Sequence, residues 1–184
     1  MNNEYSSDPL EHVRSWLATD VVALATATAG GAPSVRMVLL KEADERGFLF
    51  FTSYIGRKAR DLAENPRAAM LFHMPGRQIR IEGRVEKVSE TESDAYWAVR
   101  PRGSQVAASI SSQSEPIESR EELERRFAEF DAAHSGELPR PAHWGGYRLI
   151  PDSYELWEHH ENRLHDRVRY RREGESWTVE RLQP

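Results

Sequence analysis

The apolar positions of this chain recur mostly in short runs, and several runs have the two-residue period of β-strands. The clearest alternation lies in residues 78–88, where Ile79, Ile81 and Val85 share one face. The other apolar runs are equally short and are separated by turns that contain Gly or Pro. The pattern predicts strands at residues 21–28, 34–41, 48–52, 68–72, 78–88, 146–150, 153–157, 167–172 and 177–182.

Helix signals occupy a smaller part of the chain. Asp8-Pro9 is a cap and first-turn signal for a short helix over residues 10–17. Ser89 and Glu92 form a capping-box pattern that opens a helix extending through Arg100. Further helices are expected at residues 57–65 and 118–133.

These elements predict a mainly β protein with helical insertions (α+β), built around a small antiparallel barrel. We expect residues 1–20 to form a polar segment with the short helix. Residues 21–184 are long enough to bury a core of their own, so we expect them to form a single domain.

Composition narrows the class of protein. The formal net charge is -5, which argues against a general nucleic-acid-binding protein because such proteins are usually basic. The absence of cysteine excludes disulfides and thiol nucleophiles. No apolar run approaches the ~20 residues that span a bilayer, and the N-terminus lacks the pattern of a signal peptide. We therefore expect a cytoplasmic protein with no nucleic-acid or membrane partner.

Residues 162–170 concentrate possible cations. If this segment is a strand, alternation places Arg163, His165, Arg167 and Arg169 on one face. Such a face could be solvated, could contact nucleic acid, or could line a pocket for a small anion. Local spacing alone does not choose among the three.

Two other parts of the chain could bind anions. Arg57 and Lys58 open a predicted helix, where free backbone N–H groups already favour an anion. Tyr96 and Arg100 are one helical turn apart, and Ser104 follows closely. Simple solvation of these side chains remains the alternative. The histidines near residue 160 lack the spacing of a metal site, so we expect no metal.

An ordered set of motifs then identifies a family resemblance. The set covers nearly the whole chain from residue 21 and comprises RMVLLK (36–41), FFTS (50–53), GRKARDLAENPRAA (56–69), RQIRIEG (77–83), YWAVRPRGSQ (96–105), SSQS (111–114), WGGYRL (144–149), ELW (155–157), RLHDR (163–167) and RLQP (181–184). It resembles the pyridoxine/pyridoxamine 5′-phosphate oxidase family. The succession of RPRxSQ, RLHDR and a terminal RLxP is the specific part of the resemblance.

The resemblance implies an FMN-binding split β-barrel that forms a homodimer, with flavin mononucleotide (FMN) at the interface. Its members oxidise pyridoxamine or pyridoxine 5′-phosphate to pyridoxal 5′-phosphate, with O2 as the electron acceptor and release of H2O2. We also expect the segments around residues 57 and 113 to reach one flavin across the two-fold axis.

The resemblance also implies roles for individual residues. The implied FMN contacts are Arg36, Met37, Val38, Leu39, Leu40, Lys41, Phe51, Thr52, Arg57, Lys58, Gln78, Gln113, Ser114, Trp157 and Arg167. The implied substrate contacts are Lys41, Tyr96, Arg100, Ser104, Arg163, Leu164 and His165, with Arg163 and His165 as the catalytic residues.

Two departures and two alternatives accompany these expectations. The connection over residues 72–77 is shorter than in the family, and Glu158-His159 stands where the family usually has Gln-Gly. Both departures could reshape the substrate lid. The alternatives are a related flavin oxidase acting on another ring, as in phenazine biosynthesis, and a non-catalytic protein that binds flavin or pyridoxal phosphate.

Overall fold

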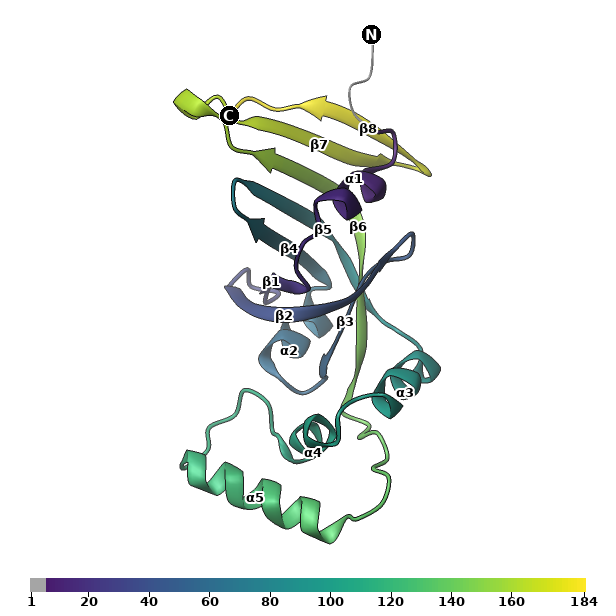
Figure 1. The fold of residues 1–184 in the computed structure, drawn as a ribbon, viewed down its shortest axis with the longest axis vertical. Helices are drawn as coiled ribbons and strands as arrows, with labels where there is room; N and C mark the ends of the chain where they lie inside the picture. The colour runs from purple at the N-terminus through teal and green to yellow at the C-terminus, as the bar shows by residue number, and fades with distance from the viewer. Residues whose placement is uncertain (1–5) are drawn as a thin grey trace.

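The computed structural model describes residues 6–184 and contains one eight-stranded antiparallel sheet (Figure 1). Six strands follow in the order β3-β2-β1-β4-β5-β6, and β6 pairs back with β3 to close a barrel. The last two strands extend the sheet from β6 as a hairpin. The strands are β1 (Val21–Ala27), β2 (Pro33–Asp44), β3 (Gly47–Ser53), β4 (Arg67–Met74), β5 (Arg77–Lys87), β6 (Trp144–Glu158), β7 (Asp166–Glu173) and β8 (Ser176–Arg181). The predicted mainly β class and split-barrel architecture are confirmed.

The helices cover the two ends of the barrel (Figure 1). They are α1 (Pro9–Trp16), α2 (Arg57–Glu64), α3 (Glu90–Ala98), α4 (Arg102–Ile110) and α5 (Arg120–Ala133). Helices α3, α4 and α5 lie together below the barrel and are called the helical lobe from here on. The predicted capping box is present, because Ser89 accepts from the Glu92 N–H and Glu92 accepts from the Ser89 N–H. Helix α3 ends at Ala98, slightly before the predicted Arg100.

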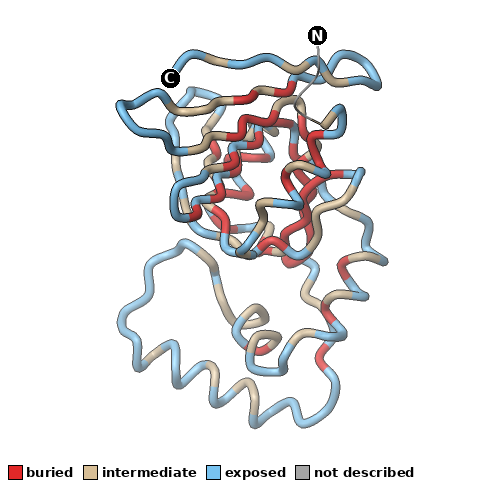
Figure 2. The backbone as a smooth tube through the Cα atoms, turned by 45° about the horizontal axis from the view of Figure 1, so that its top comes forward, coloured by how far each residue is buried: buried red, intermediate tan, exposed pale blue. Residues whose placement is uncertain are grey.

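The barrel interior forms the main core. Inward-facing side chains such as Phe50, Phe72 and Ile79 are fully buried, as alternation in the strands requires. A smaller cluster in and beside the helical lobe contains Trp97 and Trp144. Figure 2 shows that buried backbone is concentrated in the barrel, whereas most of the lobe is exposed or intermediate. Helix α5 has no buried residue.

The structure differs from the sequence analysis at three places. Residues 146–150 and 153–157 are one strand, because Pro151 sits where β6 changes partner from β3 to β7 and its missing N–H interrupts no ladder there. Helix α4 was not predicted, since its N-cap is Pro101 and no side chain caps it. Residues 161–163 form a 3₁₀ turn with Asn162 at φ 56°, so β7 begins only at Asp166.

Within residues 6–184, no helix is both long and apolar enough to cross a bilayer.

Candidate active site

The N-terminus of α2 forms a cationic corner, which we call the α2 corner (Gly56, Arg57 and Lys58). Gly56 is the N-cap and offers no capping side chain. Lys58 is buried, and its Nζ donates to Gln113 Oε1 at 2.6 Å and to Thr52 Oγ1 at 3.1 Å. Within residues 6–184, no carboxylate forms an ion pair with Lys58. Burial, together with the nearby positive charge of Arg36, lowers the pKa of Lys58 to about 8.

The segment around Gln113 packs directly on the α2 corner. Ser114, at φ 74°, accepts a hydrogen bond from the Arg57 N–H at 3.2 Å. A Cβ on Gly56 would lie 2.5 Å from Gln113 Oε1, so any larger residue there would displace the Gln113 side chain. One chain therefore brings residues 57 and 113 together. The expectation that the two-fold axis is needed to join them is wrong.

Arg36 reaches the same region from β2. Its Nη1 donates to Thr26 Oγ1 at 2.7 Å and to the Leu24 carbonyl at 3.2 Å. Its Nη2 lies 3.7 Å from the buried carboxylate of Asp61 in α2. Burial lowers the pKa of Arg36, and the negative charge of Asp61 opposes that effect.

A second cationic group lies at the junction of α3 and α4. Arg100 is partly buried, and its Nη2 donates to the Ser104 carbonyl at 3.2 Å. Its Nε is buried and has no hydrogen-bond partner within residues 6–184. No carboxylate among these residues forms an ion pair with Arg100. Burial lowers the pKa of Arg100, while the neighbouring Tyr96 opposes this effect.

Stacked aromatic rings stand beside Arg100. Phe51 stacks on Tyr96 with ring centroids 4.0 Å apart, and Lys41 Nζ lies 5.9 Å from the Tyr96 ring. Trp144, which the sequence did not indicate, continues the stack 5.5 Å from Phe51. A cavity of about 320 Å³ extends from this group to Thr52 and Gln113, the hydrogen-bond partners of Lys58. Its lining comprises Phe51, Thr52, Ser53, Arg100, Ser104, Ala107, Ala108, Ser111, Gln113 and Trp144.

A separate cavity of about 340 Å³ lies on the outer face of β5, β6 and β7. The register places Gln78, Trp157 and Arg167 in one row across these strands, and all three line the cavity. The buried Glu155 accepts from Arg167 at 2.7 Å and from Arg80 at 2.5 Å, which fixes both guanidinium groups. Among the predicted flavin residues, Phe51, Thr52 and Gln113 line the first cavity, and Gln78, Trp157 and Arg167 line the second. The two cavities have no common lining residue.

His165 lies next to this row. Its ring is 4.6 Å from that of Trp157, and its Nδ1 accepts a hydrogen bond from the His160 N–H at 3.2 Å. Arg163 and Leu164 are exposed, and the 3₁₀ turn removes the strand alternation that predicted a common face for Arg163, His165 and Arg167. Burial, His159 and Arg163 all lower the pKa of His165.

The RMVLLK segment presents two faces. Arg36, Val38 and Leu40 lie on the inner side of β2, where Leu40 is buried. The outer side carries Val35, Met37 and Leu39, whose exposed fractions are 69%, 60% and 48%. Val21 on β1 and Leu71 on β4 extend this apolar surface. Side chains 36–41 therefore cannot all face one ligand from the same protomer.

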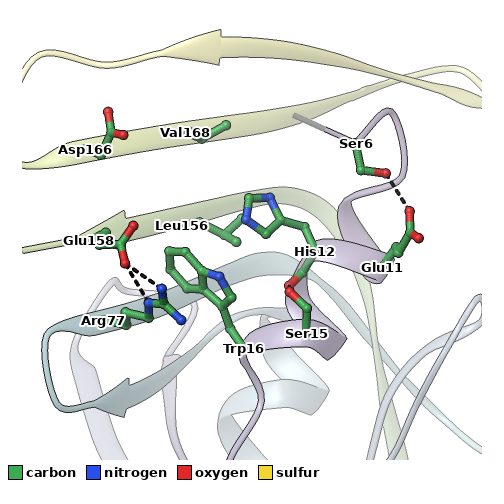
Figure 3. Close-up of a pocket in the computed structure, with 10 residues that line it drawn as sticks. All are labelled: Ser6, Glu11, His12, Ser15, Trp16, Arg77, Leu156, Glu158, Asp166 and Val168. Carbon is green, nitrogen blue, oxygen red and sulfur yellow. Dashed lines mark hydrogen bonds and ion pairs between the residues drawn. The ribbon is translucent and has the colours of Figure 1, made fainter. Parts of the chain in front are cut away.

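A third cleft, of about 460 Å³, separates α1 from β5, β6 and β7 (Figure 3). His12 and Trp16 stand over its floor, and Arg77 pairs with Glu158 at 2.6 Å. None of the residues predicted for the flavin or the substrate lines this cleft. The unusual Glu158 is thus held by Arg77 at the rim of the cleft.

The closed antiparallel barrel with its extending hairpin defines a split barrel, and comparisons with known proteins give the family. Residues 10–134 match the family Pyridoxamine 5′-phosphate oxidase, and residues 144–184 match the Pyridoxine 5′-phosphate oxidase C-terminal dimerisation region. The chain belongs to the pyridoxamine 5′-phosphate oxidase family, as its motifs predicted. The match to the dimerisation region supports a homodimer.

Curated relatives agree with this assignment. A pyridoxine/pyridoxamine 5′-phosphate oxidase of Rubrobacter xylanophilus is 56% identical over 90% of this chain and 77% of its own length. One of Cupriavidus pinatubonensis is 48% identical over 99% of this chain and 92% of its own length. The predicted class of enzyme, an oxidoreductase, is confirmed.

Solved structures agree on the fold. PhzG from Burkholderia lata, in complex with tetrahydrophenazine-1-carboxylic acid, is 36% identical with a TM-score of 0.93, covering 98% of this chain and 95% of that chain. An FMN-binding protein of Nostoc punctiforme related to pyridoxamine 5′-phosphate oxidase is 18% identical with a TM-score of 0.75, covering 98% of this chain and 100% of that chain. The family supports a flavin cofactor.

Proposed function

We propose that the protein is an FMN-dependent oxidase that converts pyridoxamine or pyridoxine 5′-phosphate to pyridoxal 5′-phosphate, with O2 as acceptor and release of H2O2. With the amine as substrate, water is also consumed and ammonia is released. The observation that carries this proposal is a pair of cationic groups near one cavity, both without a carboxylate ion pair within residues 6–184: Arg100 lines the cavity, and Lys58 of the α2 corner binds Thr52 and Gln113 in its wall. Two such groups suit two phosphates, one on the cofactor and one on the substrate.

The donors of the α2 corner fit a single phosphate. Lys58 is buried with only neutral partners, the helix N-terminus lacks a capping side chain, and Arg57 adds a second cation. An anion would supply the missing counter-charge. FMN bound there would supply a two-electron acceptor for oxidation of the substrate. The residues of this chain would supply position and electrostatics.

The substrate phosphate is assigned to Arg100, with Tyr96 and Ser104 beside it. A guanidinium group with a free Nε–H is suited to a phosphate, because it donates planar, charge-assisted hydrogen bonds. Lys41, close to the Tyr96 ring, would contact the region between the two phosphates. Arg163 and His165 would contact the reacting ring.

The two flavin-related cavities are assigned to different protomers. In this arrangement the α2 corner of one protomer and the Gln78–Trp157–Arg167 row of the other enclose one FMN. The apolar outer surface of β2 supports such an interface, because an exposed surface of this kind usually marks a contact site. FMN would then lie between the protomers of a homodimer.

Val35→Glu tests the interface. A carboxylate introduced into this apolar surface is expected to produce monomers that no longer retain FMN, since burying an unpaired charge is strongly unfavourable. Light scattering gives the oligomeric state, and absorbance gives the flavin content. Ile117→Glu, which adds the same charge at an exposed apolar residue outside the barrel, is the matched control. A Val35→Glu dimer with full FMN content contradicts the assigned interface.

His165→Ala tests the assigned catalytic end of the site. Because Nδ1 accepts from the His160 N–H, neutral His165 carries its proton on Nε2 and can donate it to the substrate ring. Loss of such a donor is expected to lower kcat by about 100-fold, with FMN content unchanged. His159→Ala removes a neighbouring imidazole and should change kcat little. An unchanged kcat for His165→Ala refutes the role.

One structural relative favours a second candidate, a flavin oxidase acting on a phenazine precursor. PhzG binds tetrahydrophenazine-1-carboxylic acid and shares this fold at a TM-score of 0.93. The unpaired guanidinium group of Arg100 favours the phosphorylated substrate.

Identification of the bound pigment tests the cofactor. The purified protein is expected to be yellow and to release FMN, because the α2 corner suits one phosphate and the chain has no dinucleotide-binding fingerprint. Extraction and chromatography distinguish FMN from its adenine dinucleotide form. A colourless protein that cannot be reconstituted with FMN contradicts the proposal.

A further inference from the structure

Arg100 is surrounded by aromatic faces instead of carboxylates. Its guanidinium carbon lies 4.6 Å from the ring centroid of Trp144 and 6.0 Å from those of Tyr96 and Trp97. A cation within about 6 Å of a ring centroid is attracted by the negative face of the ring, most strongly by tryptophan. The indole of Trp144 is therefore the strongest aromatic partner of Arg100.

The position of Trp144 is fixed from several directions. Its ring is nearly parallel to those of Phe51 (12°) and Tyr96 (10°), and the edge of Trp97 packs against it with centroids 5.0 Å apart. Its backbone N–H donates to the Pro141 carbonyl, and its carbonyl accepts from Arg140 at 2.7 Å. The side chain is 4% exposed. A ring held in this way is a rigid platform for the guanidinium group.

An aromatic platform has a chemical advantage over a carboxylate at this place. A carboxylate would neutralise Arg100 and occupy the N–H groups that an incoming phosphate needs. A ring face stabilises the partly buried charge from above the guanidinium plane and leaves the in-plane N–H groups free. The Nε–H of Arg100, which has no hydrogen-bond partner within residues 6–184, is consistent with this arrangement of a ring face on the charge and free in-plane donors.

We propose that Trp144 is a positioning residue that holds Arg100 for the substrate phosphate and so contributes to selection of phosphorylated over unphosphorylated substrates. This inference rests on the proposed function, because it takes the phosphate at Arg100 to belong to the substrate. Trp144 acts through Arg100 and itself takes no part in the oxidation.

Equilibrium binding to the FMN-loaded protein tests the role without turnover. The probes are 4′-deoxypyridoxine 5′-phosphate, which has no oxidisable group at the 4′ carbon, and unphosphorylated 4′-deoxypyridoxine. Trp144→Leu is expected to weaken binding of the phosphorylated probe by about 3- to 30-fold. The affinity of Trp144→Phe for the phosphorylated probe should lie between those of Trp144→Leu and the wild type, because phenylalanine attracts a cation less strongly than tryptophan does. The unphosphorylated probe should bind all three proteins about equally.

Two controls separate positioning from a loss of packing. Val106→Ala removes volume from the same buried cluster without removing a contact to Arg100, so it should lower the melting temperature and leave the ratio of the two affinities unchanged. In an Arg100→Ala background, Trp144→Phe should no longer affect the phosphorylated probe, since the two residues act together.

The outcomes distinguish the inference from the function on which it rests. If the wild type binds both probes equally, the assignment of the substrate phosphate to Arg100 is wrong. If the wild type prefers the phosphorylated probe and Trp144→Phe and Trp144→Leu keep the full preference, the role of Trp144 is refuted. If these variants lose affinity for both probes equally, Trp144 only packs the helical lobe. This result also refutes the proposed positioning role.

Discussion

Arg100→Ala is expected to lower kcat/KM for pyridoxamine 5′-phosphate by about 10- to 150-fold, while FMN content stays unchanged. The variant removes a charge-assisted contact of about 1.5–3 kcal/mol to the substrate phosphate. The α2 corner, which would hold FMN, contacts Gln113, Ser114 and Thr52 and does not depend on Arg100. Steady-state turnover with quantified flavin measures both effects.

A matched variant and a second substrate sharpen this test. Arg126→Ala removes the same charge from the exposed surface of α5 and should behave as the wild type. Unphosphorylated pyridoxamine should be turned over equally by Arg100→Ala and the wild type. If Arg100→Ala instead loses flavin, the two phosphate sites have been exchanged. If it leaves turnover unchanged, the substrate carries no phosphate there, and the phenazine-type alternative becomes the better account.

Lys58→Met is expected to weaken FMN binding by about 10- to 150-fold, because it deletes a buried cation assigned to the cofactor phosphate. The same variant should leave the melting temperature of the FMN-free protein equal or higher. Methionine fills a similar volume, and the desolvated charge disappears from an environment that offers only Gln113 and Thr52 as partners. Titration with FMN and thermal unfolding measure the two effects.

Lys87→Met is the chemical control, since Lys87 is exposed and packs over the Tyr54 ring. It should bind FMN as the wild type does. A Lys58→Met protein with wild-type FMN affinity shows that the cofactor phosphate binds elsewhere. If FMN-free Lys58→Met is less stable than the FMN-free wild type, the claim that the charge of Lys58 lacks a counter-charge before the cofactor binds is contradicted.

The lowered pKa of Lys58 predicts a pH dependence of FMN binding. Below about pH 8 the amine is charged, so the affinity should be nearly constant. Above about pH 8 binding requires uptake of a proton, and the affinity should fall as the pH rises. The FMN-free protein should gain stability over the same range, because the unfolded lysine, with its ordinary pKa of 10.5, then binds more protons than the folded one. FMN titrations of Lys58→Met should lack this dependence, and an equal slope in both proteins contradicts the assignment.

The parts of the fold that local signals encode were predictable. The Ser89–Glu92 capping box and the alternation of residues 78–88 both appear where expected. Helix α4 was missed because Pro101 provides no side-chain cap and the segment is rich in Ser and Gly. Pro151 falsely divided β6, since a sequence does not reveal that a strand changes partner at that residue.

In the candidate site too, features formed by neighbouring residues were predictable, whereas contacts between distant residues were not. The cationic cluster at the N-terminus of α2 was predicted from its residues alone, because Arg57 and Lys58 open the helix where free backbone N–H groups already favour an anion. Its assignment to the cofactor phosphate stays a proposal. Trp144, Glu155 and Arg80 were missed, because their contacts depend on strand pairing and on side chains distant in the chain. Trp144 contacts Arg100, and Glu155 binds both Arg167 and Arg80. Arg163 and His165 do not share a strand face with Arg167, because the left-handed conformations of Asn162 and Arg163 precede β7, which begins at Asp166.

Anaerobic mixing with pyridoxamine 5′-phosphate tests the central claim most directly. The FMN-loaded protein should lose its yellow colour within one turnover and form one pyridoxal 5′-phosphate per flavin. Admission of air should restore the colour and release one equivalent of H2O2. Persistence of the colour with pyridoxamine and pyridoxine 5′-phosphates, together with its loss on addition of a dihydrophenazine or tetrahydrophenazine carboxylic acid, would contradict the proposed function.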